Sequence, residues 1–177
     1  MDKQKILLVS CGHFERTFLE KIAANVQIAF GLPVALTENY TDLSSYYDPT
    51  RRQYDGNRLL KMMGSVTTEG SVKTMGLFDV DLFIPILTFI FGQAIFRGNS
   101  GIASIYRLKN ELYGLTGNEE LLLDRFRKVV IHELGHTFGL THCYVPSCVM
   151  RSGTYVEDID QKKHLFCLKC KEDLKML

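Results

Sequence analysis

The segment that most constrains this chain is a run of about twenty residues that ends in two histidines. Apolar side chains recur at three- and four-residue steps from Leu122 to Val130, which predicts an amphipathic helix. The helix runs on into His132 and His136. These are four residues apart, so both imidazoles project from one face and can hold the same metal ion. Glu133 lies roughly 100° around the helix from His132, where a general base is expected rather than a third ligand.

A third ligand is expected beyond the end of this helix. If the helix continued, His142 would lie roughly 240° around the axis and about 9 Å beyond His136, out of reach of a shared ion. Gly139 offers a solution, because glycine readily takes the left-handed conformation that ends a helix and turns the chain back. Three neutral imidazoles leave a fourth coordination position open, which is typical of a catalytic zinc.

The alternative is that these histidines are ordinary core residues. A chain of this composition contains His-Glu-x-x-His by chance about once in a hundred cases, and the further glycine and histidine lower this to the order of 10⁻⁵. We therefore favour a metal site. Cys11, His13 and His164 belong to no such pattern and are assigned no role.

Four of the five cysteines lie near the carboxyl terminus as two pairs, Cys143 with Cys148 and Cys167 with Cys170. Two pairs separated by about twenty residues suit a closed zinc site with four thiolate ligands, which is structural rather than catalytic. The alternatives are free surface thiols or disulfides. Because Cys143 directly follows His142, a structural ion would also fix the backbone that presents a catalytic ligand. Four neighbouring lysines are expected to offset the thiolate charge: Lys162, Lys163, Lys169 and Lys171.

Composition limits the partners and the compartment. The net charge is +1, and 46% of the residues are hydrophobic, so nucleic acid is not an expected partner. The amino terminus has only a short apolar run at Ile6–Val9 and no cleavage site for a signal peptidase, so we expect a cytoplasmic protein with reduced thiols. The most apolar stretch, Leu82–Phe96, is shorter than the about 20 residues that span a membrane and is expected to be buried core.

The remaining pattern predicts an α+β fold. The order strand, helix, strand in the first forty residues indicates a twisted mixed sheet with packed helices. We expect a loop over 40–54, and Thr116 and Glu119 match a capping box at the start of the histidine helix. From Cys143 onward the chain is expected to be irregular. The other expected elements are strands at Lys5–Cys11, Pro33–Thr37, Val72–Phe78 and Gly101–Leu108, and helices at Phe14–Phe30 and Arg58–Met63.

Taken together, His132-Glu133-x-x-His136-x-x-Gly139-x-x-His142 resembles the metzincin clan of zinc metallopeptidases. The continuation with four cysteines is similar to the archaemetzincin family in particular. The motifs cover about 40 residues of the chain. One departure is visible, since the sixteen residues between Met150 and Cys167 are one fewer than in the family pattern.

The resemblance implies a metzincin-like α+β fold, an α/β-like sandwich with an active-site helix and a small irregular, zinc-stabilised C-terminal subdomain. Residues 1–142 and 143–177 would together form one catalytic domain. It also implies that Met150 forms a Met-turn beneath the histidines. Strand Gly101–Leu108 would be an upper rim that pairs with extended substrate.

The predicted function is zinc-dependent hydrolysis of peptide bonds, by a peptidase or an aminopeptidase-like enzyme with two zinc ions per chain. Glu133 would take a proton from water and pass it to the leaving amine. Tyr155 is a candidate donor to the oxyanion. The expected partner is a peptide or protein, with no nucleic acid and no membrane. Two alternatives stay open: a zinc-stabilised interaction module whose catalytic motif is vestigial, and a hydrolase of non-peptide amides.

Overall fold

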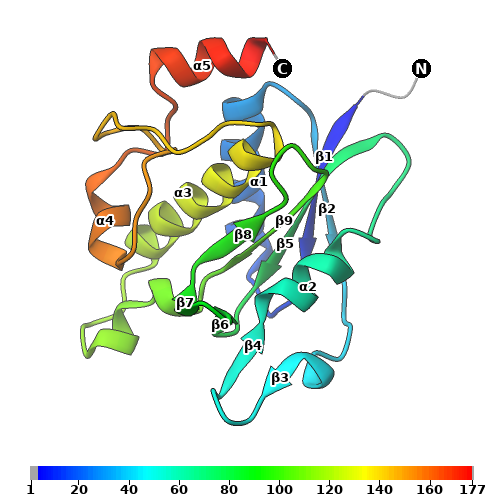
Figure 1. Ribbon diagram of the computed structural model, residues 1–177, viewed down its shortest axis with the longest axis vertical. Helices are drawn as coiled ribbons and strands as arrows, with labels where there is room; N and C mark the ends of the chain where they lie inside the picture. The colour runs from blue at the N-terminus through cyan, green and yellow to red at the C-terminus, as the bar shows by residue number, and fades with distance from the viewer. Residues whose placement is uncertain (1–3, 177) are drawn as a thin grey trace.

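The computed structural model describes residues 4–176 and has the mixed α+β fold that the sequence predicts (Figure 1). Its main sheet has the strand order β2-β1-β5-β9-β8. Four of these strands are parallel, and β8 (Gly92–Ala94) pairs antiparallel with β9 along one edge. The parallel strands are β1 (Lys5–Ser10), β2 (Val34–Glu38), β5 (Ser71–Phe78) and β9 (Ser100–Ser104).

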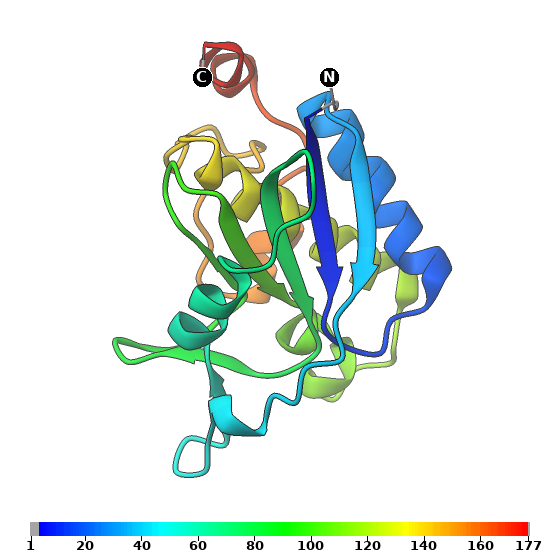
Figure 2. The ribbon, with the colours of Figure 1, turned by 90° about the vertical axis from the view of Figure 1, so that its right-hand side faces the viewer.

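Helices cover both faces of this sheet. On one face α1 (Arg16–Phe30) packs beside α3 (Glu119–Thr137), and on the other lies α2 (Gly56–Met63), as Figures 1 and 2 show. Successive residues of β1 point to opposite faces, because side chains alternate along a strand. Ile6 and Leu8 join the core under α1 and α3, whereas Leu7 and Val9 join the core under α2.

A second, smaller sheet has the order β3-β4-β6-β7. Its strands are β3 (Tyr47–Asp48), β4 (Gln53–Asp55), β6 (Leu82–Ile84) and β7 (Leu87–Ile90). The predicted loop over 40–54 is therefore wrong, since it contains β3, β4 and a short 3₁₀ turn, Ser44–Tyr46. The prediction that Leu82–Phe96 is buried core holds for Leu82, Phe83 and Ile90 but not for the segment as a whole. This segment forms a projecting hairpin and the edge strand β8, with Ile86 85% and Phe96 50% exposed (Figure 2).

Helix α3 begins two residues later than the predicted capping box. Its N-cap is Asn118, whose Oδ1 accepts a hydrogen bond from the Leu121 N–H at 3.0 Å, so Thr116 is not the cap. At the other end, Gly139 has φ = 92°, and the chain turns back as predicted. This turn sends the chain from α3 toward the carboxyl-terminal segment.

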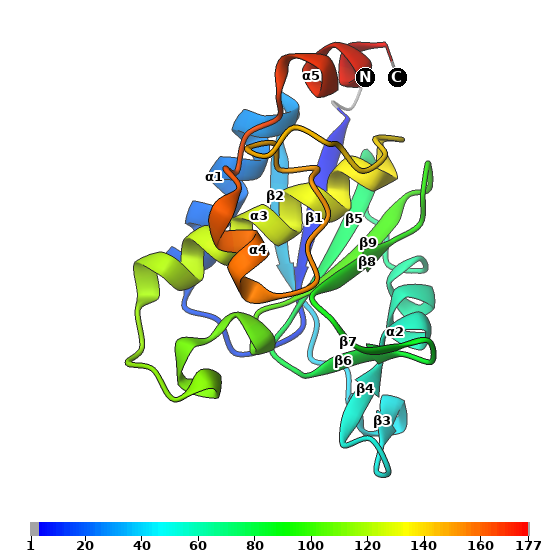
Figure 3. The same cartoon turned by 60° about the vertical axis from the view of Figure 1, so that its left-hand side comes forward.

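The prediction that the chain is irregular from Cys143 onward is wrong. It contains α4 (Val156–Gln161), which lies beside α3 in Figure 3, and α5 (Leu168–Lys175). Val156 and Ile159 of α4 are buried in the same core as Phe126 of α3. None of the helices within residues 4–176 is long and apolar enough to cross a membrane.

The prediction that the strand Gly101–Leu108 forms the upper rim is wrong in both the length of the strand and its place in the sheet. The strand ends at Ser104 and is followed by 3₁₀ turns at Tyr106–Leu108 and Asn110–Tyr113. All five residues of β9 are buried, and the strand is paired on both sides, by β5 and by β8. The free edge of the sheet next to α3 is therefore β8.

Candidate active site

The structure brings the three predicted histidines together. The Nε2 atoms of His132 and His136 lie 3.1 Å apart. One ligand atom of each histidine, His142 included, lies within 4.8 Å of the others. Their ring centroids are 4.7 to 5.3 Å apart. The turn at Gly139 is what allows His142 to approach from beyond the helix.

This geometry fits a tetrahedral zinc ion. Nitrogen ligands about 2.0–2.1 Å from zinc would lie about 3.4 Å from one another, close to the separation of the two helix histidines. Burial lowers the pKa of all three imidazoles, and most strongly that of His132. The rings are therefore neutral at ordinary pH and keep a lone pair free for a metal.

Backbone carbonyls orient the two helix histidines. Nδ1 of His132 donates to the Val149 carbonyl at 2.8 Å, and Nδ1 of His136 donates to the Leu140 carbonyl at 2.8 Å. A carbonyl can only accept, so each Nδ1 carries the proton and each Nε2 lone pair faces its neighbours. Such outer contacts fix the tautomer and the ring orientation of metal-binding histidines.

Glu133 faces the same space from the next position on α3. Burial raises the pKa of its carboxyl to about 8, so it accepts a proton far more readily than a carboxyl in water. Gly92 of the edge strand makes room for it. A Cβ at position 92 would lie 2.7 Å from the Glu133 Cγ, too close for any side chain. No pattern in the sequence predicts this role of Gly92, because the role depends on how β8 lies against α3.

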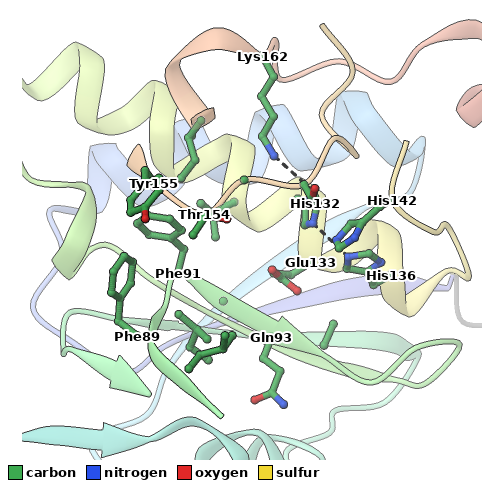
Figure 4. Close-up of a pocket in the computed structure, with 18 of the residues that line it drawn as sticks. Phe89, Phe91, Gln93, His132, Glu133, His136, His142, Thr154, Tyr155 and Lys162 are labelled. Carbon is green, nitrogen blue, oxygen red and sulfur yellow. Dashed lines mark hydrogen bonds between the residues drawn. The ribbon is translucent and has the colours of Figure 1, made fainter. Parts of the chain in front are cut away.

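These residues line a cavity of about 510 Å³ between α3, the β7–β8 segment and the loop 152–155. In Figure 4, Phe89, Phe91 and Tyr155 lie on one side of Glu133, and His136 and His142 lie on the other. His142 is exposed, so the histidine cluster can be reached from solvent. A volume of this size is within the range of small-molecule and cofactor sites.

The four predicted cysteines form a second cluster. Sγ of Cys143 lies 3.8 Å from Sγ of Cys167, and Sγ of Cys148 lies 3.7 Å from Sγ of Cys170. Thiolates about 2.3 Å from a tetrahedral zinc would be about 3.8 Å apart, whereas a disulfide requires about 2.05 Å. The arrangement therefore fits a metal with four sulfur ligands. Cys148 and Cys170 are buried, so this site is more closed than the histidine site.

Two backbone links join the clusters. Cys143 follows His142 in the chain, and its N–H donates to the Met150 carbonyl at 3.0 Å. Cys148 precedes Val149, whose carbonyl holds His132. Met150 is fully buried under α3, and its sulfur would lie 2.5 Å from a Cβ at position 135, where the chain has glycine. This places Met150 against the helix turn between the two histidines.

Lys162 is a residue whose position the sequence did not reveal. It was expected to be one of several lysines around the thiolates, but it is only 5% exposed. Its Nζ donates to the Arg151 carbonyl at 2.7 Å and lies 3.5 Å from Nδ1 of His132. Burial lowers the pKa of Lys162 to about 8. The Lys162 side chain therefore holds the loop that carries Val149 and Arg151, and it lines the cavity beside the histidines.

Other candidate residues lie apart from the histidines. Tyr155 is 63% exposed and lines the cavity beside Phe91 (Figure 4). Neither cluster includes Cys11, His13 or His164. Burial raises the pKa of the Cys11 thiol to about 12, which makes it a poor ligand and a poor nucleophile.

Comparison with known proteins shows the family of this chain. The model of peptidase family M54 matches residues 12–176. The chain belongs to peptidase family M54, the archaemetzincins. It is 35% identical to an archaemetzincin of Thermococcus kodakarensis over 175 residues, which cover 96% of this chain and 94% of the relative.

Solved archaemetzincin structures share the fold. The crystal structure of an archaemetzincin from Methanopyrus kandleri matches with a TM-score of 0.86 and 31% identity, over 98% of this chain and 94% of that one. A zinc-dependent peptidase from Methanocorpusculum labreanum matches with a TM-score of 0.83 and 26% identity, over 96% and 99%. Membership of M54 identifies this archaemetzincin as a metallopeptidase, a class of hydrolase.

Proposed function

We propose that this archaemetzincin is a metzincin-type enzyme that hydrolyses peptide bonds with two bound zinc ions. The observation that supports this most strongly is the meeting of three neutral imidazoles and the buried Glu133 carboxyl at one accessible cavity. In this proposal His132, His136 and His142 hold a catalytic zinc. The four cysteines, Cys143, Cys148, Cys167 and Cys170, hold a structural one, and residues 143–177 act as a subdomain around it.

A zinc ion at the histidines would supply an acidified water and a Lewis acid for the peptide carbonyl. Glu133 then takes a proton from the attacking water and passes it to the leaving amine. The raised pKa of Glu133 supports this role, since a general base works best with a pKa near the working pH. Met150 supports the helix turn from below, and Tyr155 is the proposed donor to the oxyanion.

Substrate would bind along β8 rather than along the predicted strand at 101–108. The Phe91 carbonyl accepts from Ser104 N–H and the Ile95 N–H donates to the Ser100 carbonyl, so alternate residues 91, 93 and 95 face β9. The backbone groups of Gly92 and Ala94 therefore face outward from the sheet edge. An extended peptide could pair with them beside Glu133.

Two alternatives differ from this proposal in chemistry. An interaction module with a vestigial site has no need of a buried carboxyl beside three histidines. A hydrolase of non-peptide amides would use the same residues but no edge strand. Because clustered free thiols favour a reducing compartment, we propose a cytoplasmic protein. As its partner we propose a peptide or protein, with no nucleic acid and no membrane.

The test is digestion of a peptide library by the zinc-loaded protein, with the products identified by mass spectrometry. We expect cleavage that a chelator abolishes and added zinc restores, because the histidine site is open and gives up its metal readily. If protein with its full zinc content cleaves no peptide in the library, the interaction module becomes the better explanation.

A further inference from the structure

The four thiols of the cysteine cluster are not equally shielded from solvent. We propose that the cluster is also a modification site for hydroperoxides such as hydrogen peroxide, which join Cys143 and Cys167 in a disulfide. The structural zinc then leaves, and a reductant with added zinc restores the site. This inference rests on the proposed structural zinc and adds a chemical event at its ligands.

The first observation is the unequal exposure of the four cysteines. Cys148 is 1% and Cys170 is 5% exposed, and both belong to the core that contains Phe126 of α3. Cys143 and Cys167 are half-buried and pack against that core from outside. A cysteine that binds zinc is a thiolate, which is the form that peroxide oxidises, and the reaction also requires access to the sulfur. Peroxide is therefore expected to attack Cys143 or Cys167 first.

The second observation is that the two half-buried thiols are neighbours. Sγ of Cys143 lies 3.8 Å from Sγ of Cys167, although the two residues are 24 positions apart in the sequence. A disulfide needs about 2.05 Å, so the sulfur atoms must approach by about 1.8 Å. Cys143 can supply this movement, because residues 141–145 belong to no helix or strand and Tyr144 is 98% exposed.

The alternative disulfide joins Cys167 to Cys170, because C-x-x-C pairs often serve in thiol–disulfide exchange. Here Cys170 lies within α5, and its sulfur is 3.7 Å from that of the buried Cys148. Drawing Cys170 toward Cys167 would open a gap in a packed core, which is costly. Moving Cys143 costs less, because the residue that follows it already lies in solvent.

The reaction needs one molecule of peroxide for each disulfide. One thiolate attacks hydrogen peroxide, breaks the O–O bond and becomes a sulfenic acid, and hydroxide leaves. The second thiolate attacks the oxidised sulfur, forms the S–S bond and displaces a second hydroxide. The two thiolates thus lose two electrons to the peroxide, and the two hydroxides take protons from solvent to give water.

Loss of two ligands releases the structural zinc and disturbs the histidine site. A structural zinc ion has four ligands, so the thiolates of Cys148 and Cys170 cannot hold it alone. Cys143 is joined directly to His142, and its N–H donates to the Met150 carbonyl at 3.0 Å. A shift of Cys143 toward Cys167 therefore pulls His142 away from the other two histidines. Oxidation is expected to lower peptide hydrolysis for this reason.

The experiment starts from wild-type protein whose zinc content has been measured. It is treated with a few equivalents of hydrogen peroxide, the excess is removed with catalase, and the desalted protein is analysed for metal. We expect the loss of at least one zinc ion for each disulfide formed. A phosphine reductant with added zinc should restore the starting content and the hydrolysis of peptides.

The position of the disulfide is mapped by mass spectrometry after free thiols are alkylated. Chymotrypsin cleaves after Tyr144 and separates Cys143 from Cys148, and trypsin cleaves after Lys169 and separates Cys167 from Cys170. The peptide that joins Cys143 to Cys167 should exceed every other disulfide by about 10-fold. Cys11→Ser is the control variant, and it should give the same disulfide, because Cys11 lies outside the cluster.

The outcomes separate the inference from the proposed function. A zinc content below two before peroxide is added would contradict the structural zinc, and the inference would fail with it. If two ions are bound at the start, three results contradict the inference alone. These are four free thiols after excess peroxide, a main disulfide between Cys167 and Cys170, and an oxidation that no reductant reverses.

Discussion

Replacing Cys170 with Ser is expected to remove both metal ions and to make the chain from Cys143 onward sensitive to proteases. Structural zinc binding in small motifs contributes about 10–16 kcal/mol, comparable to the stability of a whole domain. Without the structural zinc, both backbone links between the cysteine cluster and the histidines are lost. Cys143 no longer fixes His142, and the turn at Cys148 no longer presents the Val149 carbonyl to His132.

His136→Ala is expected to behave differently. It removes one histidine ligand but leaves α3 anchored by Phe126, Val130 and Leu134, which are fully buried. This variant should lose one zinc and remain compact, as measured by metal analysis and limited proteolysis. The matched control for Cys170→Ser is Cys11→Ser. Because Cys11 lies outside the cysteine cluster, this variant should keep both ions. A Cys170→Ser protein with both metals and full activity would falsify the structural role of the cysteines.

Glu133→Gln is expected to lower peptide hydrolysis by about 10² or more while both zinc ions stay bound. The amide keeps the size of the carboxyl, so the contact with Gly92 is preserved, but it cannot accept a proton. The measurement is kcat/KM together with zinc content. Glu120→Gln is the control on the same helix, since Glu120 is exposed in its first turn. Wild-type turnover in Glu133→Gln would rule out Glu133 as the base.

The histidine site was predictable from the sequence because its geometry is local. Two of the histidines share one helix face, and a single backbone conformation at Gly139 brings the third to them. The cysteine cluster was predictable for a similar reason, since two short-range pairs need only one long-range contact to meet. The roles of Gly92 and Lys162 were not predictable from the sequence, because they depend on which elements pack against α3.

The errors in the predicted fold have the same origin. Ser100–Ser104 reads as a strand, but whether it lies at an edge is decided by β8, three residues whose sequence carries no strand pattern. The unbroken burial of β9 is what a central parallel strand requires. Likewise, Thr116 and Asn118 are both residue types that cap helices well, and in the structure it is Asn118 whose side chain accepts from the Leu121 N–H.

The most direct test of two metal centres built from separate residues is the zinc content of the protein purified without chelator. We predict two zinc ions per chain by mass spectrometry of the metal. A mild chelator should take the first from the open histidine site and leave the second with the thiolates, because the cysteine site is the more buried of the two. A protein that is folded and active with one zinc ion, or with none, would contradict the two-centre description.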